Sequence, residues 1–589
     1  MSREKLALLV LSALLGACSE PTRSEFAADV IYENGLVYTV DRDQPWASGF
    51  AVRDGRFVGV GSSESLAGLR GESTRMEDLQ GRLVLPGLVD DHIHPDLAAE
   101  SYYNVNIDAE ADSYDDFAAA VRAYLQANPD APWVYGGSID YMWDDGSSIR
   151  MFDKPSHKSI IDELVDDRPA YFWEVSGHAA LVNTKALELL GVTKDTPDPP
   201  GGYFVRDENG ELTGLVRETA AHVVWEEYLK DQPPATEIAY KRIVPIFQYL
   251  NSLGITSITD VWSREWYMES YVLLDKNGDL TLRVSSFVTD PSDWVNEWMK
   301  EKSRQVIANP DEYTSENVRL LGVKFVLDGG AAGRTAVLTE PYEGTEDDFG
   351  PWRIDPDLFT ERLIAYDEMG LTVRAHAAGD GAARHVLDGV EELRKRGSTL
   401  RHAVAHTAIL NPADIPRFAE LDVIAEFSPV FWYYTPAVDV ITPDIGEERI
   451  GWLYPMRELL DSGAPLSVGS DWTVTQANPW TALETMVTRR APGVTTGPAL
   501  HAEHAITLEE AVYLYTAGGA YSQQQEHEIG SIEKGKAADF IVVDRNIFDI
   551  PIHEVHETEV VRTFVGGREV YNQSQKHEVI DFYGERAAE

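Results

Sequence analysis

The sequence predicts an α/β protein whose β-rich ends form one small domain around a long middle segment of βα units. In residues 29–61, short apolar runs alternate with Asn-Gly and Asp-Gly pairs, and the far C-terminus has the same character. Between these ends, short apolar runs alternate with longer amphipathic stretches, which indicates strands alternating with helices. A chain of 589 residues, 43% of them hydrophobic, is long enough for one large domain and at least one smaller one.

The N-terminus predicts export. A short basic region precedes an apolar run, Leu6 to Leu15, that is too short to span a bilayer comfortably and is typical of a signal-peptide core. The next residues, Leu15-Gly16-Ala17-Cys18, resemble a bacterial lipobox, in which the signal is cut before a cysteine that becomes lipidated. An ordinary cleaved signal with an incidental Cys18 is the alternative. We expect a signal at 1–18, a tether at 19–28, and lipid anchoring in the bacterial cell envelope, at the outer membrane or the periplasmic face.

The β-rich ends are predicted from turn signals. Asn34-Gly35 and Asp54-Gly55 each separate two apolar runs, and both pairs supply the positive φ angles that tight hairpins need. Near the other end, Gly566-Gly567 separates Val560–Val565 from Glu569–Tyr571 in the same way. We therefore expect hairpins at all three places and one β domain assembled from both ends of the chain.

The middle segment contains neither an internal repeat nor a low-complexity stretch. Thr507-Leu508-Glu509-Glu510, placed before an apolar run, predicts a helix that starts with a capping box. Outside the N-terminal run, no stretch reaches ~18 consecutive apolar residues, so we expect the mature body to be soluble.

The charge balance excludes some functions. Lys and Arg number 50 and Asp and Glu number 98, which gives a net charge of −48. A surface this negative repels phosphate backbones and anionic lipid heads. We therefore expect that the protein has no nucleic-acid partner and that it contacts the membrane only through the lipid anchor. The single cysteine excludes an intrachain disulfide. We expect a small-molecule substrate as the partner.

Histidines and one aspartate end four apolar runs of the middle segment. His92 and His94 end the first run, and because alternate residues of a strand point to the same face, their imidazoles should converge. His376 ends the second run, His406 the third and Asp471 the fourth. Taken singly, each such residue is more often structural than functional, but four similar strand ends form a pattern.

The spacing of these strand ends predicts a shared site. About one strand–helix unit separates His376 from His406, and about two separate His406 from Asp471. In a (β/α)8 barrel, all such strand ends meet at one mouth, where active sites lie. Imidazoles and a carboxylate are suitable ligands for zinc and neighbouring divalent metals. The sequence therefore predicts a metal site at this mouth.

A wider set of segments forms one joint pattern over about residues 30–572. These segments are Pro86–His94, Ser176–Ala179, Val323–Gly329, His376–Asp380, Arg401–His406, Gly469–Asp471 and Gly530–Phe540. In content and order they resemble the amidohydrolase superfamily, and specifically amidohydrolase family 3, the group that includes N-substituted formamide deformylases.

The resemblance implies a (β/α)8 TIM barrel with a metal centre at its mouth and a small β-sandwich built from both termini. We place the composite sandwich at residues 29–85 and 526–575 and the barrel at 86–525. The stretch between His94 and Lys324 is longer than the intervening barrel units need. We therefore expect an insertion around 105–220 that covers the mouth. Large acidic barrels commonly dimerise, so a homodimer is an expectation.

The resemblance also implies a binuclear centre. Lys324 would react with CO2, and the resulting carbamate would bridge two divalent ions, with Zn²⁺ as the expected metal. An unmodified Lys324 paired with a carboxylate such as Asp328 is the alternative. The implied ligands are His92, His94 and Asp471 for one ion and His376 and His406 for the other.

The expected reaction is hydrolysis of a C–N, amide-type bond in a small molecule by a metal-activated hydroxide. Asp471 would act as general base and then general acid, because it can accept the proton of the water and pass it to the leaving nitrogen. His178 matches a family position near the substrate, and we expect it to donate a hydrogen bond to the carbonyl or oxyanion. A buried histidine that orders the insertion is the alternative for His178.

Two other functions stay open. A mononuclear centre with unmodified Lys324 could deaminate its substrate or hydrolyse an ester or lactone, and a surface lipoprotein could bind ligands without catalysis. The chain departs from many family members at Ala405, where they have Glu, and at Ser428-Pro429, where they have Gln-Pro. Both departures affect the surroundings of the metals and the pocket but no ligand.

Aromatic residues of the insertion and of a later segment could line a pocket for an apolar or aromatic group. Ordinary core packing is the alternative. The residues concerned are Trp133, Tyr135, Tyr141, Trp143 and the run Phe431-Trp432-Tyr433-Tyr434.

Overall fold

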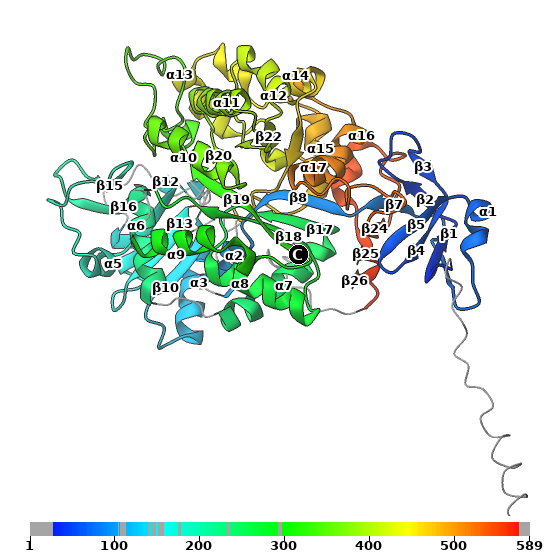
Figure 1. Ribbon diagram of the computed structural model, residues 1–589. Coiled ribbons are helices and arrows are strands. Elements are labelled where there is room, and N and C mark those ends of the chain that lie inside the picture. The colour runs from blue at the N-terminus through cyan, green and yellow to red at the C-terminus, as the bar shows by residue number, and fades with distance from the viewer. Residues whose placement is uncertain are drawn as a thin grey trace, which may run out of the picture.

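A closed barrel forms the centre of the computed structural model, which describes residues 27–103, 105–106, 114–139, 142–143, 149–150, 158–174, 178–231, 236–292 and 297–575. Its eight strands are parallel, in the order β23-β22-β21-β20-β19-β18-β17-β8 (Figure 1). These strands are β8 (Leu88–Ile93), β17 (Ile255–Asp260), β18 (Arg283–Thr289), β19 (Val318–Val326), β20 (Thr372–His376), β21 (Ala403–Ala405), β22 (Ile424–Phe427) and β23 (Leu466–Val468).

The barrel closes where β8 meets the chain that leaves β23. The backbone N–H of Asp471 donates to the carbonyl of His92 over 2.7 Å, and that of His94 donates to Trp472 over 2.7 Å. Beside them, the Ser470 N–H donates to a carboxylate oxygen of Asp90 at 2.9 Å. These bonds form the seam of the barrel, and they confirm the predicted TIM-barrel fold class.

The barrel strands are buried on both faces because helices surround them. All six residues of β17 are buried, as are all six of β8, although β8 contains two aspartates and a histidine. Thr507 is the N-cap of α16, and it forms the predicted capping box with Glu510. The main surrounding helices are α7 (Thr236–Ser252), α8 (Glu265–Asn277), α10 (Pro356–Glu368), α11 (Asp380–Lys395), α12 (Ile415–Leu421), α14 (Met456–Ser462), α15 (Pro479–Thr488) and α16 (Leu508–Tyr513).

Both ends of the described chain meet in two further sheets, seen in Figure 1 as blue strands beside orange and red ones. One sheet has the order β5-β4-β1-β6 and the other β26-β25-β24-β7-β2-β3. Aromatic rings join them: Tyr32 lies 5.1 Å from Phe540 and Phe50 lies 4.8 Å from it, between ring centres. The strands are β1 (Val30–Glu33), β2 (Leu36–Tyr38), β3 (Trp46–Ala47), β4 (Gly49–Arg53), β5 (Arg56–Gly61), β6 (Arg75–Asp78), β7 (Leu83–Pro86), β24 (Phe540–Val543), β25 (Val560–Val565) and β26 (Arg568–Asn572).

Two of the three predicted hairpins are confirmed and one is wrong. β4 and β5 pair antiparallel across Asp54-Gly55, and β25 and β26 pair antiparallel across Gly566-Gly567. At Asn34-Gly35 the chain instead passes from one sheet to the other, since β1 pairs with β4 and β6 whereas β2 pairs with β3 and β7. Asn34 has the expected positive φ of 57°, but the Gly35 N–H donates to Ser48, so the turn redirects the chain without pairing its flanks.

A separate sheet lies between β8 and β17 in the sequence, cyan to green in Figure 1. Its order is β15-β16-β14-β13-β10-β9, and α6 (Thr219–Asp231) follows it. The domain boundaries assigned from sequence stay predictions. The strands are β9 (Val105–Asn106), β10 (Val134–Ile139), β13 (Ala170–Glu174), β14 (Ala179–Val182), β15 (Gly202–Arg206) and β16 (Leu212–Glu218).

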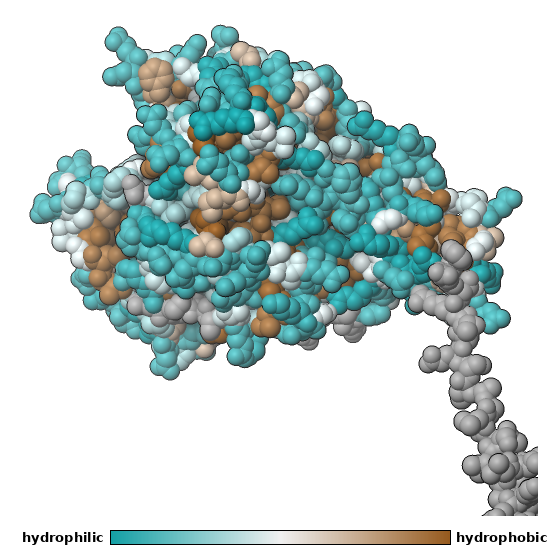
Figure 2. Space-filling model, viewed as in Figure 1, coloured by the Kyte–Doolittle hydropathy of each residue, from teal (hydrophilic) through white to brown (hydrophobic). Residues whose placement is uncertain are grey.

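Hydrophilic residues cover most of the face shown in Figure 2, and hydrophobic residues are exposed there in patches, one of them near its centre. Within the described ranges, no helix combines the length and the apolar character needed to cross a membrane. The predicted signal at 1–18, its Cys18 and most of the predicted tether lie outside the described residues.

Candidate metal centre

Four barrel strands deliver the predicted ligands to one end of the barrel. His92 lies in β8 and His94 directly follows it, His376 is the last residue of β20, and His406 directly follows β21. Asp471 comes three residues after the end of β23. All five line one cavity, whose space is about 1030 Å³ when its open mouth is included. The strand-end pattern in the sequence therefore marks residues that meet in space.

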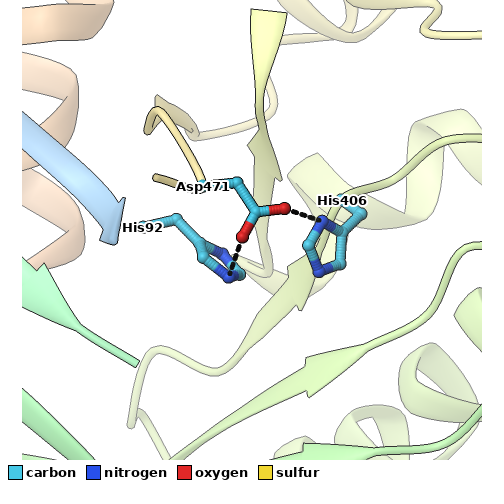
Figure 3. A group of neighbouring side chains, drawn as sticks. All are labelled: His92, His406 and Asp471. Carbon is cyan, nitrogen blue, oxygen red and sulfur yellow. Dashed lines mark ion pairs between the residues drawn. The ribbon is translucent and has the colours of Figure 1, made fainter. Parts of the chain in front are cut away.

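The carboxylate of Asp471 lies between imidazoles from opposite sides of the seam, as Figure 3 shows for His92 and His406. One carboxylate oxygen, Oδ1, is 3.2 Å from His94 Nε2 and 3.6 Å from His92 Nε2. The other oxygen, Oδ2, is 3.7 Å from His406 Nδ1. The ligand atoms of His92, His406 and Asp471 all lie within 4.8 Å of one another, which is close enough for one ion to contact all three.

His376 and Lys324 complete what we call the metal-ligand cluster, which consists of His92, His94, Lys324, His376, His406 and Asp471. The ring of His376 lies 4.4 Å from that of His406. Lys324, in β19, is 3% exposed and lines the same cavity. The group of His92, His406 and Asp471, whose ligand atoms lie within 4.8 Å of one another, includes two histidines that were predicted to bind different ions. The division of ligands between two ions therefore stays a prediction.

Lys324 does not pair with Asp328. Both oxygens of the Asp328 carboxylate accept backbone N–H bonds, from Ala378 at 3.0 Å and from Val337 and Gly379 at 2.9 Å. The Nζ of Lys324 is buried and has no hydrogen-bond partner among the described residues. Burial lowers the pKa of Lys324 to about 8, which favours the neutral amine more than in water.

Three imidazoles of the cluster, those of His92, His376 and His406, are held in their neutral form. Burial lowers the pKa of His406 to about 3 and lowers those of His92 and His376 well below the usual value. Neutral imidazole offers a ring nitrogen lone pair, which is the form that binds metals. For Asp471, burial alone would raise the pKa, but the hydrogen bond from His94 and the electrostatic interactions with His406, His94 and Lys324 hold it below its usual value.

Glu426 is a functional candidate that the sequence analysis missed. Its carboxylate lies in β22, fully buried, with Oε2 2.5 Å from Nδ1 of His92. A carboxylate on the far nitrogen of a ligating histidine fixes which nitrogen faces the metal and how the ring is oriented. A glutamate inside the apolar strand Ile424–Phe427 was the available signal.

The cluster fits a divalent cation. Nε2 of His92 and Nζ of Lys324 are buried nitrogen atoms without a hydrogen-bond partner in the described part of the chain. Unsatisfied buried polar atoms are costly, and a cation bound by His92 and by a carbamate on Lys324 would remove that cost. Neutral imidazoles together with an ionised carboxylate form the kind of donor set that zinc prefers.

His178 lines the same cavity beside the cluster, where its ring centre is 5.7 Å from that of His376. Its Nδ1 is 3.1 Å from Oε2 of Glu218 and 3.2 Å from Nη2 of Arg353. Arg353 and Glu218 also pair with each other. A guanidinium can only donate and a carboxylate can only accept, so Arg353 favours the tautomer with its proton on Nε2 whereas Glu218 favours the one with its proton on Nδ1.

The aromatic predictions are resolved in part. Tyr135 lines the cavity, whereas Trp133 packs in the core of the insertion, edge-on to Tyr228. Trp432 is fully buried and stacks on Tyr454 at 4.8 Å, away from the cavity. Tyr141 and the side chains of Trp143 and Phe431 lie outside the described residues. Aromatic rings that the sequence analysis did not single out line the cavity instead: Trp173, His222, Trp225 and Trp262.

Comparisons with known proteins agree with this geometry. The sequence profile described as "Amidohydrolase family" matches residues 75–571. The chain is 29% identical to "Protein LONG AFTER FAR-RED 3" of Arabidopsis thaliana, with 92% of each chain covered. It is 26% identical to the N-substituted formamide deformylase of Arthrobacter pascens, over 92% of this chain and 97% of that one. An uncharacterized metal-dependent hydrolase from Pyrococcus furiosus superposes with a TM-score of 0.67 at 24% identity, over 88% of this chain and 99% of that one.

Proposed function

Because the chain belongs to the amidohydrolase family and is thus a metal-dependent hydrolase, we propose that it hydrolyses a C–N bond of amide type in a small molecule. One observation carries the proposal: the Asp471 carboxylate lies among the imidazoles of His92, His94 and His406 at the mouth of the barrel. The relative named N-substituted formamide deformylase, similar over nearly its whole length, supports the choice of bond.

The metal-ligand cluster would hold the metal. Divalent ions bound there would polarise the scissile carbonyl as Lewis acids and lower the pKa of the attacking water. Glu426 accepts a hydrogen bond from Nδ1–H of His92, which leaves Nε2 of that ring to face the cluster. Zn²⁺ is our proposed metal, because imidazole and carboxylate ligands suit it.

Asp471 is our proposed proton carrier. Its lowered pKa keeps the carboxylate ionised, so an oxygen of Asp471 can accept a proton from the attacking water. The same oxygen then gives that proton to the amine nitrogen as the C–N bond breaks. We assign the proton of His178 to Nε2, from which it would donate a hydrogen bond to the carbonyl oxygen as negative charge develops on that oxygen.

Lys324 is our proposed bridging residue. In its neutral form, Nζ attacks the carbon of CO2, a new N–C bond forms while one C=O π bond breaks, and one proton passes from the nitrogen to solvent water. The product is an anionic carbamate, whose oxygen atoms could serve as ligands to two cations. Two features support this assignment: Nζ has no hydrogen-bond partner in the described chain, and burial favours its neutral form.

We further propose that the protein is exported and anchored by a lipid on Cys18, with its body in the cell envelope, and that it forms a homodimer. The lipobox-like residues before Cys18 support the anchor. Radiolabelled palmitate incorporation that disappears in Cys18→Ala would test the anchor, and sedimentation of the purified protein would test the dimer.

Metal content and turnover together test the proposed function. The protein without residues 1–18 would be dialysed, its metals counted by elemental analysis, and its activity assayed on N-formyl, N-acyl and cyclic amides. About two equivalents with amide hydrolysis is the expected result. One equivalent, with hydrolysis of esters or deamination instead, would favour the mononuclear alternative. An intact fold that takes up no added zinc would overturn the proposal in favour of a binding protein.

A further inference from the structure

We propose that the substrate carries a planar aromatic group without a positive charge, which lies against four aromatic rings beside His94. This inference rests on the proposed function and names its substrate class. We call these rings the aromatic wall: Trp173, His222, Trp225 and Trp262. All four line the same cavity as the metal-ligand cluster.

The four rings pack against one another as a continuous surface. Trp173 lies 5.4 Å from His222 and 5.8 Å from Trp225 between ring centres. His222 stacks on Trp262 at 5.3 Å, and Trp225 meets Trp262 edge-on at 6.5 Å. Such spacing leaves no room for a ligand between the rings, so a ligand would contact them from the cavity side. Trp173 and Trp262 are the two wall rings that keep part of their surface exposed.

The wall reaches the metal-ligand cluster at His94, and the proposed carbonyl donor reaches it at His376. The ring of Trp262 is 6.3 Å from that of His94, and that of His178 is 5.7 Å from that of His376. A substituent of an amide whose scissile bond lies at Asp471 can therefore reach the ring of Trp262 beside His94. Flat apolar surface there favours a planar aromatic substituent, because ring–ring contact adds to the gain from burial.

The charges around the wall select against a cationic group. The guanidinium of Arg264 lies 5.5 Å from the ring centre of Trp225 and pairs with Asp96 and Glu100 at 2.7 and 2.6 Å. A cationic substituent on Trp225 would therefore share that ring with a cation that is already bound. A neutral aromatic ring avoids this repulsion.

The test compares amides that differ only in the ring. The wild-type protein would be assayed on N-benzylacetamide, on its isomer N-methyl-2-phenylacetamide and on N-methylacetamide. We expect at least one ring-bearing amide to exceed N-methylacetamide in kcat/KM by roughly ten- to hundredfold. The isomers place the ring on the amine or the acyl side, so their order tells which side faces the wall. The acetamide of (2-aminoethyl)trimethylammonium, which has a trimethylammonium group in place of the ring, should not exceed N-methylacetamide in kcat/KM.

Trp262→Leu and Trp173→Leu should each reduce this preference by about tenfold. The matched control is Trp133→Leu, which removes a buried tryptophan of the same insertion that does not line the cavity and should leave the preference unchanged. An absent preference in the wild type, an equal loss in Trp133→Leu, or a gain for the trimethylammonium amide would overturn the inference.

Binding separates the inference from the proposed function. Quenching of tryptophan fluorescence by N-benzylacetamide reports binding whether or not the amide is hydrolysed. Trp262-dependent quenching without hydrolysis of any amide would overturn the proposed function and support the aromatic site. Hydrolysis of N-methylacetamide without quenching by either ring-bearing isomer would support the proposed function and overturn the aromatic site.

Discussion

The metal-ligand cluster and the aromatic wall face the same cavity but are built in different ways. Every residue of the cluster lies within or just beyond a barrel strand, and its side chains meet across short distances fixed by the parallel sheet. The wall combines a strand residue, two residues of α6 and one residue from the loop after β17. The difference supports a division of the proposed function, in which the barrel strands supply the chemistry and the segments around the cavity select the substrate.

Variants of the two regions should behave differently. Changes in the metal-ligand cluster should alter metal content or the chemical step for every substrate, whereas changes around the aromatic wall and His178 should alter activity and selectivity at constant metal content. The following variants test this division, in order of decreasing expected effect.

Asp471→Asn should have the largest effect. The amide cannot accept a proton from water, so kcat should fall by at least about a thousandfold for all substrates. The backbone bond from residue 471 to His92 is retained, so the melting temperature should stay close to that of the wild type. Steady-state kinetics and calorimetry would measure both quantities. Turnover near the wild-type rate would show that another group carries the proton.

Lys324→Ala should lose most of its metal and about a hundredfold in activity. A short carboxylic acid such as propionate, added to fill the space of the carbamate, should restore part of both. Lys324→Arg is the control, because it keeps a cation but cannot form a carbamate, and it should also bind little metal. Unchanged metal content in the alanine variant would remove Lys324 from the centre.

Glu426→Gln should raise the metal dissociation constant by about ten- to hundredfold, because an amide oxygen is a weaker acceptor for the Nδ1–H of His92 than a carboxylate is. Glu484→Gln is a matched control: Glu484 is equally buried, and its carboxylate lies 2.7 Å from Nδ1 of His556, outside the cavity. The control should lose stability but not metal affinity. Titration with a competing chelator would measure the constants, and equal losses in both variants would contradict a specific role for Glu426.

Glu218→Gln should have the smallest effect of the four. It removes the charge that pairs with Arg353 beside His178, so we expect kcat/KM to fall by about tenfold at unchanged metal content. Elemental analysis alongside kinetics would check this. A variant that also lost metal would place His178 and its partners with the cluster, and the division between the two regions would be wrong.

The sequence was sufficient for the barrel and for the meeting of the cluster residues. A ligand at a strand end is a local pattern, and parallel strands bring such ends to one rim, so His92, His376, His406 and Asp471 could be grouped without coordinates. The division of these residues between ions could not, because it depends on side-chain positions that differ by a few ångströms.

The wall and Glu426 were not predicted because they depend on tertiary packing. Trp173, His222 and Trp262 are far apart in the sequence, and nothing in their neighbours distinguishes them from Trp133, which lies in the core. Asn34 shows the same limit for turns. Its backbone has the expected positive φ, but a turn does not specify whether the strands on either side pair with each other.

The seam of the barrel has a consequence for folding. β8 and β23 are the first and last barrel strands, and His92 and Asp471 reach the cavity from either side of their junction. A cation bound by both would cross-link two segments separated by almost the whole barrel, a closure whose entropic cost grows with the length of chain enclosed. Metal binding would thus shift the equilibrium from opened toward closed barrels, because His92 and Asp471 are adjacent only when β8 and β23 have come together. Apo protein should therefore exchange its seam amides, including that of Asp471, faster than the metal-loaded protein does.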